Sequence, residues 1–217
     1  MRRHYFRTVS GITLALTIWG FSDNLFWRVE QPSNSDPKFI VHGLSCLAWM
    51  IVFFTQASLV GRGNVTLHRR LGVAAFSVAI AVTLSTTWLF VAVWKGWSTM
   101  PIYAQANRLL LPTFAACVLL AYVNRRDRER HKRYLLIGTL CMLEPVLSRA
   151  FDPLDPILRD YPAAIVDGAW QLFAVVVWTG LFLSLFAYDR LVDGKIHRVS
   201  SVGFAWAWCV WIIVALF

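Results

Sequence analysis

Hydrophobic residues run along this chain in long blocks that are separated by short polar stretches rich in arginine and lysine. A helix needs about 20 mainly apolar residues to cross roughly 30 Å of hydrocarbon, and the blocks have about that length. The pattern therefore predicts an all-α membrane protein, a bundle of about seven transmembrane helices. We place these helices at Thr8–Trp27, Phe39–Val60, Leu71–Trp94, Gln105–Val123, Tyr134–Phe151, Pro162–Tyr188 and Ser201–Phe217.

The first of these helices has the weakest pattern. Ser22, Asp23 and Asn24 interrupt it after a short apolar core, and the arginines before that core are also typical of the start of a signal peptide. No Ala-x-Ala-like cleavage site follows, so we expect an uncleaved membrane anchor. Nothing in the sequence marks a second domain, and we predict that residues 1–217 form a single transmembrane helical domain.

The composition agrees with this prediction. Apolar residues make up 58% of the chain and charged residues 15%, whereas a soluble domain carries about 25% charged residues. A formal net charge of +9 is also a feature of nucleic-acid-binding proteins, but here the basic residues lie in the short loops between apolar blocks. We therefore reject nucleic-acid binding and expect the partners to be the lipid bilayer and anionic phospholipid headgroups at the cytoplasmic face.

The positions of lysine and arginine predict the orientation in the membrane. If the N-terminus is cytoplasmic, most of the 21 basic residues fall on the cytoplasmic side. Six acidic residues gather on the other side: Asp23, Glu30, Asp36, Asp152, Asp155 and Asp160. The positive-inside rule then gives an N-in, C-out topology. We expect a multi-pass protein of the plasma (bacterial inner) membrane. The cytoplasmic basic groups are at residues 2–7, 62–70, 125–133 and 190–198.

Several enzyme and cofactor classes have no support in the sequence. The cysteines lie singly in different apolar blocks, which argues against a disulfide framework or a thiolate zinc site. The last helix has no lysine for a retinal Schiff base, and there is no Gly-rich phosphate loop or nucleophile elbow. The sequence leaves open whether the chain is an enzyme. The cysteines are Cys46, Cys117, Cys141 and Cys209.

Histidines stand at the cytoplasmic starts of the helices that run outward, each beside arginine or lysine. One interpretation is a lipid-facing basic collar, because basic helix N-termini bind phospholipid headgroups. A second interpretation concerns His68 and His131, which lie at one membrane face on helices separated by one antiparallel neighbour. Two such helices can hold haem between neutral imidazoles, with adjacent arginine or lysine neutralising the propionates. The segments are Leu67-His68-Arg69-Arg70, Arg130-His131-Lys132-Arg133 and Ile196-His197-Arg198.

A longer series of residues carries a resemblance to a known family. His42-Gly43, the segment Gln56–Val60, the segment His68–Gly72 and His131 resemble the ascorbate-dependent transmembrane b-type cytochromes. In that family, consecutive helices each supply a histidine near one end, and pairs of histidines hold two haems. The resemblance covers the predicted second to fifth helices and implies that His42, His68 and His131 occupy ligand positions.

One ligand position of that family has no histidine in this chain. The corresponding segment, residues 103–108, reads Tyr-Ala-Gln-Ala-Asn-Arg. The resemblance therefore implies the inner haem site, formed by His68 and His131, and does not supply the outer one. The chain is more similar still to a broad group of uncharacterised bacterial multi-pass membrane proteins with the same His-Gly, His-Arg-Arg-Leu-Gly and His-Lys-Arg series. That similarity implies no activity.

Ionisable and polar residues in the outer half of the predicted helices form a further candidate site. An ionisable group at the centre of a membrane helix costs about 2.5–3.5 kcal/mol on insertion scales, so such groups should pair inside the bundle. We predict the pairs Glu144–Arg108 and Asp167–Arg149. These pairs either form part of a ligand pocket that opens outward or only fix the register of the helices. The pocket residues are His42, Arg108, Glu144, Arg149, Asp167 and Gln171.

Two prolines favour the pocket interpretation. Pro112 and Pro145 each free a backbone carbonyl within a predicted helix, and such carbonyls are tolerated where they line protein or a water-filled cavity. His42, Glu144 and Asp167 are residue types that bind zinc or iron, but they lack a local ligand spacing, so we predict no metal site. A proton-relay role for Glu144 is an alternative.

Three hypotheses for function follow. The first is a redox protein in which haem b between His68 and His131 exchanges electrons with a quinol or a small reductant. The second is a non-enzymatic ligand-binding or transport protein that uses the outer pocket. The third is a structural or assembly factor of a membrane complex.

Overall fold

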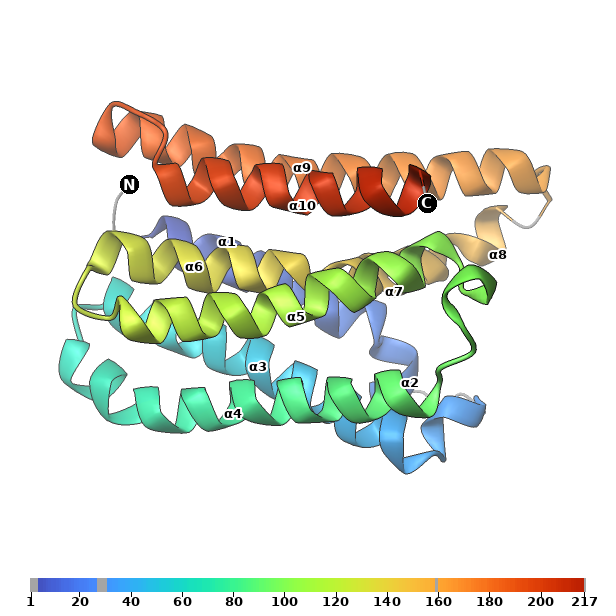
Figure 1. Ribbon diagram of the computed structural model, residues 1–217, viewed down its shortest axis with the longest axis horizontal. Helices are drawn as coiled ribbons and strands as arrows, with labels where there is room; N and C mark the ends of the chain where they lie inside the picture. The colour runs from blue at the N-terminus through green and yellow to red at the C-terminus, as the bar shows by residue number, and fades with distance from the viewer. Residues whose placement is uncertain (1–3, 27–30, 159, 217) are drawn as a thin grey trace.

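The computed structural model describes residues 4–26, 31–158 and 160–216, and its regular elements in these ranges are all helices (Figure 1). The predicted all-α class is therefore confirmed. The longer helices are α1 (Tyr5–Gly20), α3 (Pro37–Gly61), α4 (Val65–Ala92), α5 (Ile102–Val123), α6 (Arg128–Cys141), α7 (Glu144–Phe151), α9 (Ala163–Asp193) and α10 (Arg198–Leu216). The short elements are α2 (Ser22–Phe26), α8 (Asp155–Leu158) and the 3-10 turns η1 (Pro32–Asn34), η2 (Trp97–Thr99) and η3 (Asp152–Leu154).

The helix lengths are consistent with a multi-pass membrane protein. The 5 helices α3, α4, α5, α9 and α10 are long and apolar enough to cross a membrane, and α6 with α7 makes a sixth if the bent pair is one span. The helix α1 has 16 residues, fewer than the about 20 that a span needs. The structure therefore supports 5 or 6 spans, whereas the sequence predicts about seven.

The first predicted helix is interrupted where its polar residues lie. The helix α1 ends at Gly20, and α2 begins at Ser22, whose hydroxyl donates to the carbonyl of Trp19 at 2.7 Å. Gly20 packs against the backbone of α7, since a Cβ added there would lie 2.7 Å from the Ala150 nitrogen. Only glycine permits so close an approach. The predicted end of this helix, Trp27, lies outside the described residues, as does Phe217 at the end of the last one.

The helices α3 to α6 pack in chain order, and α1 and α10 lie against them. Contacts join α3 with α4, α4 with α5 and α5 with α6, while α1 lies on α3 and α7, and α10 lies on α5, α6 and α9 (Figure 1). The Trp49 indole N–H of α3 donates to Thr139 Oγ1 of α6 at 3.1 Å, and its ring meets Phe114 of α5 edge-on at 4.9 Å. The helices α3, α5 and α6 therefore share one core around this tryptophan.

The outward faces of the long helices carry apolar side chains. Leu84 and Val91 of α4 are 66% and 72% exposed, and Leu172 of α9 is 65% exposed. A soluble monomer rarely leaves large contiguous apolar surfaces in water. Such faces are suited to contact with lipid.

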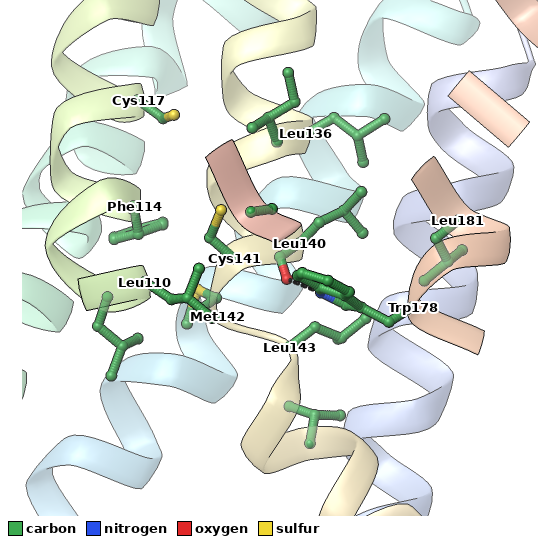
Figure 2. Close-up of a cluster of buried hydrophobic side chains, with 14 of the residues drawn as sticks. Leu110, Phe114, Cys117, Leu136, Leu140, Cys141, Met142, Leu143, Trp178 and Leu181 are labelled. Carbon is green, nitrogen blue, oxygen red and sulfur yellow. Dashed lines mark hydrogen bonds between the residues drawn. The ribbon is translucent and has the colours of Figure 1, made fainter. Parts of the chain in front are cut away.

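The predicted helix Tyr134–Phe151 is divided into α6 and α7, which meet at a bend of 50°. Pro145 has no N–H and removes one helical hydrogen bond at this break. The indole N–H of Trp178 on α9 donates to the carbonyl of Leu140 at 2.8 Å, within a cluster of buried apolar side chains (Figure 2). By contrast, α5 continues through Pro112.

Candidate functional site

His68 and His131 lie near the starts of α4 and α6, at the same end of the bundle. The Asn64 side chain caps α4 by accepting a hydrogen bond from the Leu67 N–H at 3.1 Å, and Asp127 caps α6 in the same way. The two imidazole rings are 6.4 Å apart between their centroids, and their planes are nearly perpendicular, at 84°. The structure thus brings together two histidines that are far apart in the sequence.

The two rings differ in their hydrogen bonds. His131 Nδ1 lies 2.8 Å from the carbonyl oxygen of Ala121 on α5. Because a carbonyl oxygen only accepts, Nδ1 carries the proton and Nε2 presents a lone pair. Metal-ligating histidines are commonly oriented by such a bond from the second ring nitrogen. His68 Nδ1 is buried and has no hydrogen-bond partner among the described residues.

Further polar atoms without partners lie at the same end of α3. The side-chain oxygens of Gln56 and Ser58 are buried and have no hydrogen-bond partner in the part of the chain that the structure describes. His68 lies beside the backbone of Gln56. Buried polar groups in native proteins are nearly always hydrogen-bonded, so these atoms can take part in binding beside the two imidazoles. Unpaired buried oxygens also occur near the opposite end, on Gln105 and Asn107, so it is the imidazole pair that distinguishes this end.

The spacing of the two rings fits one metal ion held between them. A histidine nitrogen lies about 2 Å from a bound transition metal, so rings on opposite sides of one ion have centroids roughly 6 Å apart. The observed distance of 6.4 Å agrees with this value, and imidazole is a ligand that suits haem iron. Arg69 and Arg70, next to His68, are exposed. No carboxylate pairs with either of them in the described ranges, so both are available to an anionic group.

A buried charge cluster, which the sequence analysis missed, lies at the same end. Arg133 and Asp189 are both fully buried, and Arg133 Nη2 is 2.6 Å from Asp189 Oδ1. Asp193 and Glu129 also pair with the guanidinium, at 2.7 and 2.6 Å. Asp189 Oδ2 accepts the backbone N–H of His197 at 3.0 Å. The cluster therefore ties α6 to the end of α9 and to the turn before α10.

The prediction that Arg133 belongs to a lipid-facing collar is wrong, because its side chain points into the bundle. Lys132 is also engaged, through an ion pair with Glu129 at 2.6 Å. Two signals in the sequence were available. Glu129 and Arg133 are four positions apart, which places them on one face of a helix. Asp189 and Asp193 are acidic residues in an otherwise basic segment that the sequence predicts to be cytoplasmic.

The residues of the predicted outer pocket do not form a single site. Glu144, at the start of α7, is buried, and its Oε2 accepts a hydrogen bond from Asn107 Nδ2 at 2.6 Å. Arg108 instead lies over the rings of Phe90 and Trp94, with its guanidinium carbon 4.7 and 4.8 Å from their centroids. The predicted pair Glu144–Arg108 is therefore wrong, because each side chain has another partner.

The second predicted pair is also wrong. Arg149 is 3.2 Å from Asp152, three residues further along the chain, and donates to Gln31 Oε1 at 2.9 Å. Asp167 and Gln171 are exposed near the start of α9. Arg149 therefore pairs with Asp152 and, at 3.9 Å, with Asp23, and not with Asp167.

His42 has small polar side chains as neighbours. Its Nδ1 is 3.4 Å from the hydroxyl oxygens of Ser85 and Thr86 on α4, and its Nε2 is 3.7 Å from the thiol of Cys46. In the described part of the chain, no three or more His, Cys, Asp or Glu side chains gather as metal ligands. His42 thus belongs to no such group among the described residues.

Comparison with known protein families, with curated proteins and with solved structures found no match for this chain. The resemblance to b-type cytochromes therefore stays a prediction.

Proposed function

We propose that this chain is a membrane redox protein that binds haem b between His68 and His131 and exchanges electrons with a quinol or a small reductant. The observation that carries the proposal is the pair of neighbouring imidazoles on separate helices, with ring centroids 6.4 Å apart. The basic loops at this end favour a cytoplasmic location for the site, with an N-in, C-out topology in the plasma membrane.

Different residues of the chain would bind different parts of the haem. The Ala121 carbonyl orients the His131 ring and leaves Nε2 as the ligand atom. His68 supplies the second ring, and the exposed arginines Arg69 and Arg70 supply positive charge for the propionates. When bound, haem supplies a one-electron couple between ferric and ferrous iron.

We expect one haem per chain, not the two of the cytochromes that the sequence resembles. At the other end of α3, the neighbours of His42 are Ser85, Thr86 and Cys46. The segment 103–108, where the resemblance requires another ligand, contains no histidine. The second haem of that family therefore lacks a ligand pair in this chain.

The test is the absorption spectrum, oxidised and dithionite-reduced, of protein purified in a mild detergent from haem-supplied cells. A bound b-type haem gives sharp reduced α and Soret bands. His68→Ala and His131→Ala are expected to abolish these bands completely while leaving the yield of folded protein unchanged. The matched controls are His197→Ala, at the same end, and His42→Ala, at the other end, and both should keep the parent spectrum.

Two outcomes would overturn the proposal. One is a colourless parent protein that contains no iron. The other is a spectrum that survives in both His68→Ala and His131→Ala, since the haem would then be held elsewhere.

The ligand-binding or transport hypothesis has less support. Its pocket residues are engaged separately, Glu144 with Asn107 and Arg149 with Asp152. Asp167, which the hypothesis places in the pocket, is exposed on α9. The assembly-factor hypothesis gives no account of the imidazole pair.

A further inference from the structure

A groove between α5, α6 and α10 opens at the same end of the bundle as the imidazole pair. Its volume is about 510 Å³, within the range of about 300–1,000 Å³ that ligand pockets occupy. Arg130 of α6 and Arg198 of α10 line it, together with His197, which precedes α10. In Figure 1 the starts of α6 and α10 lie at the same end of the molecule, which places these basic residues at one end of the groove.

The rest of the groove is mainly apolar. Its walls include Cys117 and Leu120 of α5 and Trp206 of α10. The Trp206 indole N–H donates to Thr113 Oγ1 at 2.8 Å, so this donor at the far end of the groove already has an acceptor within the protein. Trp206 lies about two turns, or about 12 Å, beyond Arg198 along α10. The groove is therefore basic at one end and apolar along its length.

Hydrogen-bond donors remain available at the basic end. Arg198 is exposed, and no carboxylate among the described residues pairs with it. Arg130 pairs with Asp127 through Nε at 3.2 Å. His197 Nδ1 accepts the Val199 N–H at 3.1 Å, so the proton of the neutral ring is on Nε2. A bound anion can therefore receive hydrogen bonds from both arginines and from His197.

The buried charge cluster around Arg133 and Asp189 holds the rim of the groove in place. Asp189, itself paired with Arg133, accepts the backbone N–H of His197. Gly194 ends α9 in the left-handed region, with φ 70°, which turns the chain back toward α10. The basic end is therefore attached to a fixed turn rather than to a free loop.

We propose that this groove binds one anionic phospholipid. The phosphate lies between Arg130 and Arg198 with His197 Nε2 as a further donor, and an acyl chain lies along Leu120 and Trp206. Basic pockets between transmembrane helices are typical sites for anionic headgroups. Because its walls are apolar, the groove favours a phosphate that carries an acyl chain over free inorganic phosphate. The site differs from a general basic collar, because it needs the groove as well as the charges, and it does not depend on haem.

The test is thermal unfolding of the delipidated full chain in detergent, titrated with phosphatidylglycerol, phosphatidylcholine or inorganic phosphate at constant ionic strength. A ligand that binds only the folded state raises Tm in a saturable way. We expect phosphatidylglycerol to raise Tm, phosphatidylcholine to raise it much less, and inorganic phosphate to leave it unchanged. Native mass spectrometry should show one retained phosphatidylglycerol per chain.

Two variants and a control separate the groove from the collar. Arg130→Gln/Arg198→Gln should lose the rise in Tm, whereas Arg62→Gln/Arg126→Gln removes the same charge from exposed positions at this end and should keep it. Val202 is 58% exposed and lines the groove, so Val202→Trp fills the groove with both arginines in place and should also lose the rise.

Several results would overturn the proposal. Equal stabilisation by phosphatidylcholine would show that the groove does not recognise the negative charge of the headgroup. An equal rise in Tm with inorganic phosphate would show that the acyl chain of the lipid contributes nothing to binding. A rise that persists in Val202→Trp, or one that is lost equally in the control pair, would assign the effect to headgroup binding at the collar. All variant sites are exposed, so gel filtration of each variant should show the parent's folded peak.

Discussion

The ionisable residues at the two ends of the bundle differ in their partners and in their burial. At one end, side chains from separate helices meet, since His68 of α4 lies beside His131 of α6 and Arg133 of α6 pairs with Asp189 of α9. At the other end, the ion pairs are partly exposed. Arg149 pairs with Asp152 on the next turn of its own segment and lies 3.9 Å from Asp23, and these side chains are 29%, 45% and 32% exposed. Convergence of side chains from separate helices together with burial of their charges, more than the presence of charge in an apolar block, marks the candidate site.

The largest effect that would sharpen this contrast concerns the pair Arg133–Asp189. The variant Asp189→Ala leaves the buried guanidinium without its buried partner, and breaking a buried ion pair costs about 3–5 kcal/mol. The matched change at the other end is Asp152→Ala. Asp152 and its partner Arg149 are 45% and 29% exposed, so we expect Asp152→Ala to lower the free energy of unfolding by at most about 1 kcal/mol. Denaturation by SDS in mixed micelles measures both free energies of unfolding.

A double variant distinguishes the loss of an ion pair from general damage. Arg133→Met/Asp189→Leu removes both buried charges and should recover most of the stability that Asp189→Ala loses, because no unpaired charge remains buried. Similar losses for Asp189→Ala and Asp152→Ala would remove the contrast between the two ends.

A smaller effect is expected at Glu144, between the two ends. Its Oε2 accepts from the buried Asn107 amide at 2.6 Å. Glu144→Leu leaves that amide without its acceptor, whereas Glu144→Gln keeps an acceptor oxygen in place. The leucine variant should therefore be less stable than the glutamine variant by about 1–3 kcal/mol. If Arg108→Ala cost the most and the two Glu144 variants were equal, Arg108 would be the partner of Glu144 after all.

The sequence predicted the long helices well because hydrophobic length reports directly on membrane-crossing segments. It placed their boundaries less well. The helix α4 begins at Val65 and α6 at Arg128, each about two turns before its apolar block. The capping side chains Asn64 and Asp127 start these helices, and hydropathy does not detect caps. As a result His68 and His131 lie inside helices, where their positions are fixed.

The pairing of polar side chains was less predictable. The sequence placed the end of α9 at Tyr188, but the helix continues to Asp193, where Gly194 ends it. That extension keeps Asp189 within a helix that packs on α6, opposite Arg133. Pairing depends on where each helix ends and on which face it turns toward its neighbour, and a pattern of apolar blocks specifies neither. The nearness of His68 and His131 was predictable because antiparallel neighbours return to one face.

The smallest expected effect is a pH dependence that differs between the two ends. Partial burial, and then the nearby Arg133 guanidinium, lower the pKa of His197 from its ordinary value, while Asp189 acts in the opposite direction. At the other end, the hydrogen bond from Lys38 lowers the pKa of Asp36, which precedes α3. Acid therefore acts on the two ends in separate pH windows.

The sign follows from proton linkage at each group. As pH falls below about 6.5, the unfolded chain protonates His197 before the folded chain does, so stability decreases. The Asp36 contribution persists through that window and is lost only when pH falls below about 4, through the lowered pKa. Tm measured against pH should thus fall less steeply near pH about 6 in His197→Gln than in the parent, while Asp36→Asn should flatten only the acidic limb. A steeper fall in His197→Gln would mean that the folded state prefers the imidazolium, and the proton on Nε2 would no longer mark His197 as a neutral donor at the groove.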